Sequence, residues 1–82
     1  MKKYPKLIDV KVLPDYCLAL SFNNTEIRLY DFKPNLDHRF YSILQKEDLF
    51  NKVSVIDGEL EWITGQDFCP HTLYENGVDY TE

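Results

Sequence analysis

Four side chains of this 82-residue sequence could act as soft metal ligands, namely Cys17, His38, Cys69 and His71. Four such ligands are enough for a tetrahedral zinc site. Structural zinc sites, however, bring their ligands in close pairs such as Cys-x2-Cys, and here only Cys69 and His71 are close. The spacing argues against a metal site, and we expect neither a metal nor any other cofactor.

Cys69 could instead be a nucleophile if His38 or His71 acted as its base. Such a pair needs a stabilised thiolate and a third group that orients the base. A helix start at Cys69 would favour the thiolate, but the acidic neighbours Asp67 and Glu75 disfavour it. So short a chain also leaves little wall for a substrate pocket. We expect that the protein is not an enzyme, and a small thiol enzyme is the least favoured alternative.

Length and composition indicate one small domain over residues 1–82. The sequence is 44% hydrophobic and 15% aromatic, which is above the range of disordered chains. No run approaches the roughly 20 apolar residues of a membrane helix, and residues 1–5 lack the apolar segment of a signal peptide. We therefore expect a cytoplasmic protein in which Cys17 and Cys69 are reduced, a disulfide between them being the less favoured alternative.

The formal charge of −5 is unevenly distributed along the chain. Residues 57–82 contain no Lys or Arg, and their acidic residues are Asp57, Glu59, Glu61, Asp67, Glu75, Asp79 and Glu82. An acidic surface repels phosphate, so nucleic acid is a poor partner for this part and a basic protein fits better. The structural explanation is that these residues only keep a small domain in solution.

Three N-terminal segments, 7–13, 17–22 and 26–31, alternate apolar and polar residues and predict a meander of antiparallel strands. Pro14-Asp15 predicts a type I turn, and Asn23-Asn24 predicts a hairpin whose residues tolerate positive φ. The side chains expected to point inward are Ile8, Val10, Val12, Leu18, Leu20, Phe22, Ile27 and Leu29. The opposite face of the third strand would present Arg28 and Tyr30, and without a covering helix it would be a docking surface, a second copy being one occupant.

From Leu36 the apolar period becomes helical, which predicts one helix with Asp37 as its N-cap. Its apolar face would contain Leu36, Phe40, Ile43, Leu44 and Phe50. The alternative is an extended segment over residues 39–42 followed by a helix from Gln45 to Asn51.

Asp57-Gly58 predicts a type I′ turn between strands 53–56 and 59–62. Val53, Val55, Leu60 and Trp62 would point inward, and Glu59 and Glu61 outward. Beyond Gly65, Asp67 or Cys69 followed by Pro70 predicts a helix start, Gly77 predicts its end, and residues 78–82 are expected to form a frayed tail. The elements together predict an α+β fold with an antiparallel sheet, in the order β3-α-β2-α.

This order of elements, with Trp62, Gly65 and Asp67 followed by Pro70, Leu73 and Tyr74, resembles the bacterial family called domain of unknown function 2442. Leu49-Phe50 corresponds to the Leu-Phe of that family. The sequence departs from the family pattern at Ile63, Thr64 and Cys69, where Pro, Asn and a small hydroxylic or acidic residue are usual. The resemblance implies a β3-α-β2-α fold, no established catalytic residues, and genes that stand beside a second small protein in an arrangement similar to toxin–antitoxin pairs.

We therefore expect a non-catalytic protein-interaction or regulatory module, with a protein partner encoded by an adjacent gene or a second copy as the partner. The predicted partner-binding residues are Glu59, Glu61, Asp67, Tyr74 and Glu75. Asp67 also has a structural interpretation, as a helix cap or turn stabiliser. The alternative function is a transcription-associated module that contacts nucleic acid through Lys2, Lys3, Lys6 and Lys11.

Tyrosines are candidate interface residues because they combine a large ring with a hydrogen-bonding hydroxyl. The set is Tyr4, Tyr16, Tyr30, Tyr41, Tyr74 and Tyr80.

Overall fold

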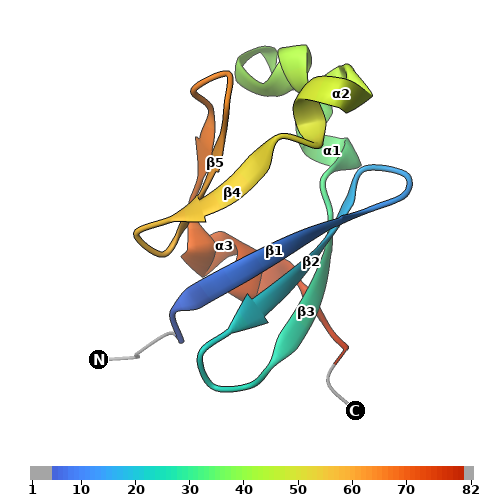
Figure 1. Ribbon diagram of the computed structural model, residues 1–82. Coiled ribbons are helices and arrows are strands. Elements are labelled where there is room, and N and C mark those ends of the chain that lie inside the picture. Colours follow the sequence, from blue (N-terminus) through green and yellow to red (C-terminus); the bar gives the residue numbers. More distant parts are fainter. Residues whose placement is uncertain (1–4, 81–82) are drawn as a thin grey trace.

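The chain forms two antiparallel sheets joined by short helices, and the computed structural model describes residues 5–80 (Figure 1). The larger sheet has the strand order β1-β2-β3-β7, and the smaller has the order β4-β5-β6. The strands are β1 Leu7–Leu13, β2 Cys17–Phe22, β3 Ile27–Asp31, β4 Val53–Ile56, β5 Glu59–Trp62, β6 Asp67–Phe68 and β7 Val78–Asp79. The helices are α1 Lys33–Leu36, the 3-10 helix Arg39–Gln45, α2 Glu47–Phe50 and α3 Pro70–Asn76. The predicted α+β class is confirmed. None of the helices within residues 5–80 has the length and apolar character needed to span a bilayer.

A bulge near the start of β1 changes which side chains point inward. The pairing with β2 shifts between Leu7 and Asp9, and Leu7 lies opposite Phe22 in the core. An extra residue in a bulge bends the strand and re-aims its neighbours. The prediction that Ile8 points inward is wrong, because its side chain is exposed while Leu7 is buried.

The two faces of β3 are opposite to the prediction. Arg28 and Tyr30 lie across from two fully buried leucines of β2, so they project toward the core side. Ile27 and Leu29 consequently project from the outer face, which is where Arg28 and Tyr30 were expected. The alternation shows which residues share a face, but the strand register decides which face is buried. The predicted docking surface of Arg28 and Tyr30 is therefore wrong.

In the turn from β2 to β3, the residue with positive φ is not one of the two asparagines expected to adopt it. Thr25 has the left-handed backbone, with a φ of 74°. The asparagines contribute through their side chains instead. Asn23 Oδ1 accepts a bond of 3.0 Å from the Lys6 amide, and Asn24 Oδ1 accepts one of 3.0 Å from the Glu26 amide. The Asn24 bond is local to the turn, whereas the Asn23 bond ties the turn to the residue before β1. Neither bond requires positive φ at the asparagine.

Three short helical segments replace the single helix predicted from Leu36 onward. Leu36, Leu44 and Phe50 are buried as expected, but Phe40 is 49% exposed and Ile43 is also exposed. A 3-10 helix has three residues per turn, so the predicted 3.6-residue stripe does not stay on one side. The alternative is wrong in its extended segment at 39–42 and right in placing a helix within 45–51.

Asp37 is not the N-cap of any of these segments. It follows the last residue of α1, and its backbone amide donates to the Asn35 carbonyl. His38 precedes the 3-10 helix, and its Nδ1 accepts a bond of 3.2 Å from the Phe40 amide. The capping function that we assigned to a carboxylate is thus performed by an imidazole one residue later.

The hairpin of β4 and β5 is confirmed in its position, turn and faces. Asp57 and Gly58 both have positive φ, 52° and 82°, as a type I′ turn requires. Inward residues are Val53, Val55, Leu60 and Trp62, and outward residues are Glu59 and Glu61. Trp62 Nε1 also donates a bond of 2.9 Å to the Phe50 carbonyl, so the indole is both packed and satisfied.

Helix α3 begins at Pro70 and ends before Gly77, as predicted. Cys69 is its N-cap residue, whereas Asp67 lies in β6, so Asp67 does not cap the helix. A Cβ at Gly77 would lie 2.7 Å from the Leu73 carbonyl oxygen, so only glycine fits there.

The predicted frayed tail is wrong for the described part of the C-terminus. Val78–Asp79 forms strand β7 on the edge of β3, and the Tyr80 amide donates a bond of 2.8 Å to the Ile27 carbonyl. Residues 81–82 lie outside the described residues. Edge pairing to a neighbouring strand is a long-range property that a short C-terminal sequence does not show.

Phe32 lies at the centre of the core, where the two sheets and the helical connection meet. Its side chain is fully buried. Its ring contacts five other aromatic rings, with centroid distances of 5.0 to 6.1 Å, from Tyr30, Tyr41, Phe50, Trp62 and Phe68. Aromatic pairs in edge-to-face and tilted geometry add to the free energy of apolar burial. Phe32 should therefore dominate the stability of the fold.

We predict that Phe32→Ala lowers the free energy of unfolding by about 3–5 kcal/mol, because it leaves a cavity at this position. Phe40→Ala is the matched control, since the half-exposed Phe40 ring should cost under about 1 kcal/mol. Urea unfolding followed by circular dichroism measures both. If Phe32→Ala does not fold, Phe32→Leu should fold with a smaller loss. Equal losses at the two positions would contradict the central role of Phe32.

Candidate functional site

Three of the predicted partner-binding residues lie together on the outer face of the smaller sheet. Glu59 and Glu61 both project outward from β5, and Asp67 lies directly across from Glu61 on β6. All three are exposed. Like charges directly opposite on neighbouring strands repel each other and are destabilising. We name the surface of Glu59, Glu61 and Asp67 the acidic face.

A shallow groove of about 360 Å³ adjoins the acidic face at Glu61. Two of its lining residues are unusually exposed for their type: the side chain of Ile56 is 48% exposed and that of Ile63 is 71% exposed. Lys52 lies among its other lining residues. The groove therefore places apolar surface beside the carboxylates, as interfaces do.

Asp67 contributes its backbone as well as its charge. Its carbonyl accepts a bond of 2.9 Å from the Tyr41 hydroxyl, which holds the 3-10 helix against β6. Burial raises the pKa of Tyr41, and the negative charge of Asp67 raises it further. Asp67 thus has a structural role, but through the carbonyl and not as the predicted cap.

Tyr74 does not join the acidic face. It lies on α3, where its ring packs edge-on against Phe22 at 5.2 Å, and the Arg28 guanidinium sits 4.0 Å from the ring centroid. Its hydroxyl donates a bond of 3.0 Å to Glu26 Oε1. Arg28 in turn forms an ion pair of 2.7 Å with Glu26. The tyrosine is therefore part of a network that fixes α3 to β3.

Glu75 also lies away from the acidic face, on α3 one residue beyond Tyr74. Its carboxylate is 2.6 Å from His71 Nε2, one helical turn earlier. A pair at this spacing supports the helix locally. The five predicted partner-binding residues are thus divided between the smaller sheet and α3.

Most of the tyrosines are used in packing. Tyr16, Tyr30, Tyr41 and Tyr74 all pack against the hydrophobic core. Tyr80 is the exception among the described tyrosines, because its side chain is 57% exposed. Tyr4 lies outside the described residues. Of the candidate interface tyrosines within residues 5–80, Tyr80 is therefore the one with an exposed side chain.

The residues considered for metal or thiol chemistry are dispersed. Cys17 and Cys69 are free thiols, and Cys17 Sγ is 3.7 Å from the Asp15 carbonyl. His38 binds the Phe40 amide, and His71 binds Glu75. Over residues 5–80 no group of three or more His, Cys, Asp or Glu side chains is arranged to hold a metal ion.

The described part of the basic N-terminal strip is not compact. Lys2 and Lys3 lie outside the described residues. The aliphatic chain of Lys6 passes over Gly58, where an added Cβ would be 3.2 Å from Lys6 Cε. Lys11 lies five residues further along the chain, which is about 16 Å in an extended strand. Lys11 projects from the outer face of the larger sheet.

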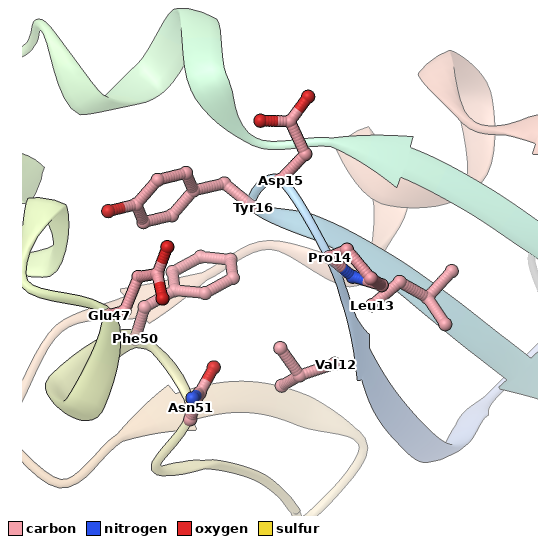
Figure 2. Close-up of a pocket in the computed structure, with 8 residues that line it drawn as sticks. All are labelled: Val12, Leu13, Pro14, Asp15, Tyr16, Glu47, Phe50 and Asn51. Carbon is pink, nitrogen blue, oxygen red and sulfur yellow. The ribbon is translucent and has the colours of Figure 1, made fainter.

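The sequence did not indicate a hollow of about 380 Å³ between the β1–β2 turn and α2 (Figure 2). Asp15 and Tyr16 form the turn with φ values of 68° and 60°, so it is not the predicted type I turn. Tyr16 packs edge-on against Phe50 at 5.1 Å, and its hydroxyl donates to the Gln45 carbonyl. The residues that line the hollow are Val12, Leu13, Pro14, Asp15, Tyr16, Glu47, Phe50 and Asn51.

The chemistry of this hollow is limited. Figure 2 shows the Asp15 carboxylate directed away from Val12 and Phe50, and this carboxylate forms an ion pair of 3.3 Å with Lys33. Glu47 and Asn51 are the remaining polar side chains of the lining. One carboxylate and one amide do not make an acid–base pair. The hollow brings together residues 12–16 and 47–51, which only the tertiary fold makes neighbours.

The network at Tyr74 predicts a pH dependence of stability. The hydrogen bond from Arg28 lowers the pKa of Glu26, and the Tyr74 hydroxyl lowers it further. A carboxyl whose pKa is lowered on folding stabilises the fold above its unfolded pKa, and the stabilisation is lost as pH falls through the folded pKa. We expect Glu26→Gln to reduce the loss of stability between neutral pH and acid. Urea titrations at several pH values check this, with Glu59→Gln as the control for an exposed glutamate. Identical pH profiles for Glu26→Gln and the unmodified protein would contradict it.

Comparison with known proteins finds one family. The family described as protein of unknown function (DUF2442) matches residues 7–79. No curated protein and no solved structure matches the chain. The match spans β1 to β7 and includes Trp62, Gly65, Asp67, Pro70, Leu73 and Tyr74, the residues that carried the resemblance. The chain belongs to the DUF2442 family of proteins of unknown function.

Proposed function

We propose that this protein is a non-catalytic, cytoplasmic protein-interaction module that binds a basic protein partner through the smaller sheet. The observation that carries the proposal is the acidic face beside the groove that contains the exposed side chains of Ile56 and Ile63. Carboxylates attract a basic partner, and the adjoining apolar surface supplies area to be buried on binding.

The register of β5 and β6 supports a partner that carries Lys or Arg. Glu61 and Asp67 are held opposite each other, so their repulsion is present in the free protein. A cationic side chain placed between them would relieve this repulsion and form two charge-assisted bonds. Favourable electrostatics would also raise the association rate at low salt.

The gene arrangement that the family resemblance implies suggests a specific partner. We propose that the module is the acidic partner of a toxin–antitoxin-like pair, and that the product of the adjacent gene binds the acidic face. Binding should then depend on the carboxylates of the acidic face, and not on the total negative charge of residues 57–82.

We predict that Glu59→Lys/Glu61→Lys weakens binding of the co-expressed, purified product of the adjacent gene by roughly tenfold or more, because the attraction becomes repulsion. Isothermal titration calorimetry at low and moderate salt measures the change. The control is Asp37→Lys/Glu75→Lys, which changes the net charge equally on exposed residues outside the smaller sheet. It should stay within about threefold of the unmodified protein.

Equal weakening by the two double variants would show that bulk charge and not the acidic face governs binding. Unchanged binding by Glu59→Lys/Glu61→Lys would place the partner elsewhere. Absence of binding by the unmodified protein would exclude the product of the adjacent gene as its partner. Circular dichroism of each variant checks that the fold is retained.

A further inference from the structure

Within residues 5–80, no helix or strand covers the outer face of the larger sheet. Helix α3 packs on the core side of this sheet, behind strands β1 to β3 in Figure 1. The outward side chains form a hollow of about 410 Å³ on the other side. We name this surface the open face, and its residues are Asp9, Lys11, Leu13, Ala19, Ser21, Ile27, Leu29, Val78 and Tyr80. It is separate from the acidic face, so the inference below is independent of the proposed function.

Strand pairing orders the open face into two rows that run across all four strands. The first row is Asp9, Ser21, Ile27 and Tyr80, because Asp9 pairs with Ser21, Ser21 with Ile27, and the Tyr80 amide binds the Ile27 carbonyl. The second row is Lys11, Ala19, Leu29 and Val78, which pair in the same order. Each row thus has a charge at the β1 end, a small residue in the middle and apolar residues at the β7 end.

The two rows complement each other. We propose that the open face binds the open face of a second copy of this chain about a two-fold axis that crosses the strands between the rows. Such an axis places each row on the other row of the partner copy. The contacts would then be Asp9 on Lys11, Ser21 on Ala19, Ile27 on Leu29 and Tyr80 on Val78, each formed twice.

The charges are what favour a second copy over another partner. Asp9 and Lys11 have opposite sign and lie on either side of the axis, so two ion pairs form only if the copies are antiparallel. In a two-fold interface every contact between residue i and residue j is repeated as j and i. On this face the repetition places unlike charges together and apolar side chains together. Two packed sheets with nearly aligned strands are a common arrangement.

The apolar half of the open face provides the area to be buried. The side chains of Val78 and Tyr80 are 69% and 57% exposed, and Ile27 is also exposed. Ser21 and Ala19 face each other in this arrangement, and their small side chains allow the two sheets to approach closely at the middle of the rows. The strands β1, β2 and β3 have 7, 6 and 5 residues and β7 has 2. At a spacing of about 4.8 Å, four strands give a footprint roughly 19 Å wide and at most about 17 Å along the strands. This is a small interface, so we expect a dimer that forms at micromolar to submillimolar concentration.

Charge variants test the arrangement. Asp9→Lys places two lysines on β1 and Lys11→Asp places two aspartates there, so each variant would meet like charges in its own dimer. We expect the dissociation constant of the unmodified dimer to rise at least tenfold in either variant, as measured by sedimentation equilibrium up to about 1 mM. Lys46→Asp, at an exposed lysine before α2, is the control and should leave dimerisation unchanged.

An equimolar mixture of the two variants provides the decisive measurement. Each lysine of one chain then faces an aspartate of the other, so the mixture should recover dimers of mixed composition, detected by native mass spectrometry. A protein that remains monomeric at 1 mM would overturn the proposal. Dimers that are insensitive to both variants, or that are not recovered on mixing, would also overturn it and would indicate a different interface. None of these outcomes depends on binding at the acidic face.

Discussion

The contact between Phe32 and Trp62, whose ring centroids are 5.0 Å apart, is the interaction on which both sheets depend. Phe32 directly follows β3 of the larger sheet, and Trp62 ends β5 of the smaller sheet. Trp62 also donates its indole N–H to the Phe50 carbonyl at the end of α2. A domain of this length buries a modest fraction of its surface, so a few large rings at one point carry much of its stability.

Concentrating the core between the sheets leaves two outer faces to solvent. The smaller sheet presents carboxylates beside exposed isoleucines, and the larger sheet presents rows with charge at one edge and apolar side chains at the other. Both faces have features that a solvated surface does not require. Opposed carboxylates repel each other in the isolated chain, and exposed apolar side chains that adjoin one another are a mark of interaction surfaces. Because the two faces belong to different sheets, the proposed binding of a basic protein and the proposed binding of a second copy can occur together.

Local signals explain the parts of the fold that the sequence predicted well. Asp57-Gly58 dictates a type I′ turn through its backbone preferences, so the hairpin and its faces followed from adjacent residues. The helix start at Pro70 is similarly local. The prediction of one helix from Leu36 onward was wrong because the apolar residues there fit an α-helical period. The chain instead forms a 3-10 helix, and Phe40 remains half exposed. Nothing in a period of three or four residues distinguishes these helices.

The sequence by itself determined the α+β class, the family, the first three strands, the second hairpin and the outward carboxylates of β5, because each depends on neighbouring residues or on a motif. Only the tertiary structure decided which face of β3 is buried, that Tyr74 binds Glu26, and that β7 completes the larger sheet. It also decided that the acidic face excludes Tyr74 and Glu75. The physical reason is register: a shift of one residue exchanges the two faces of a strand, and register is set by turns and long-range pairing.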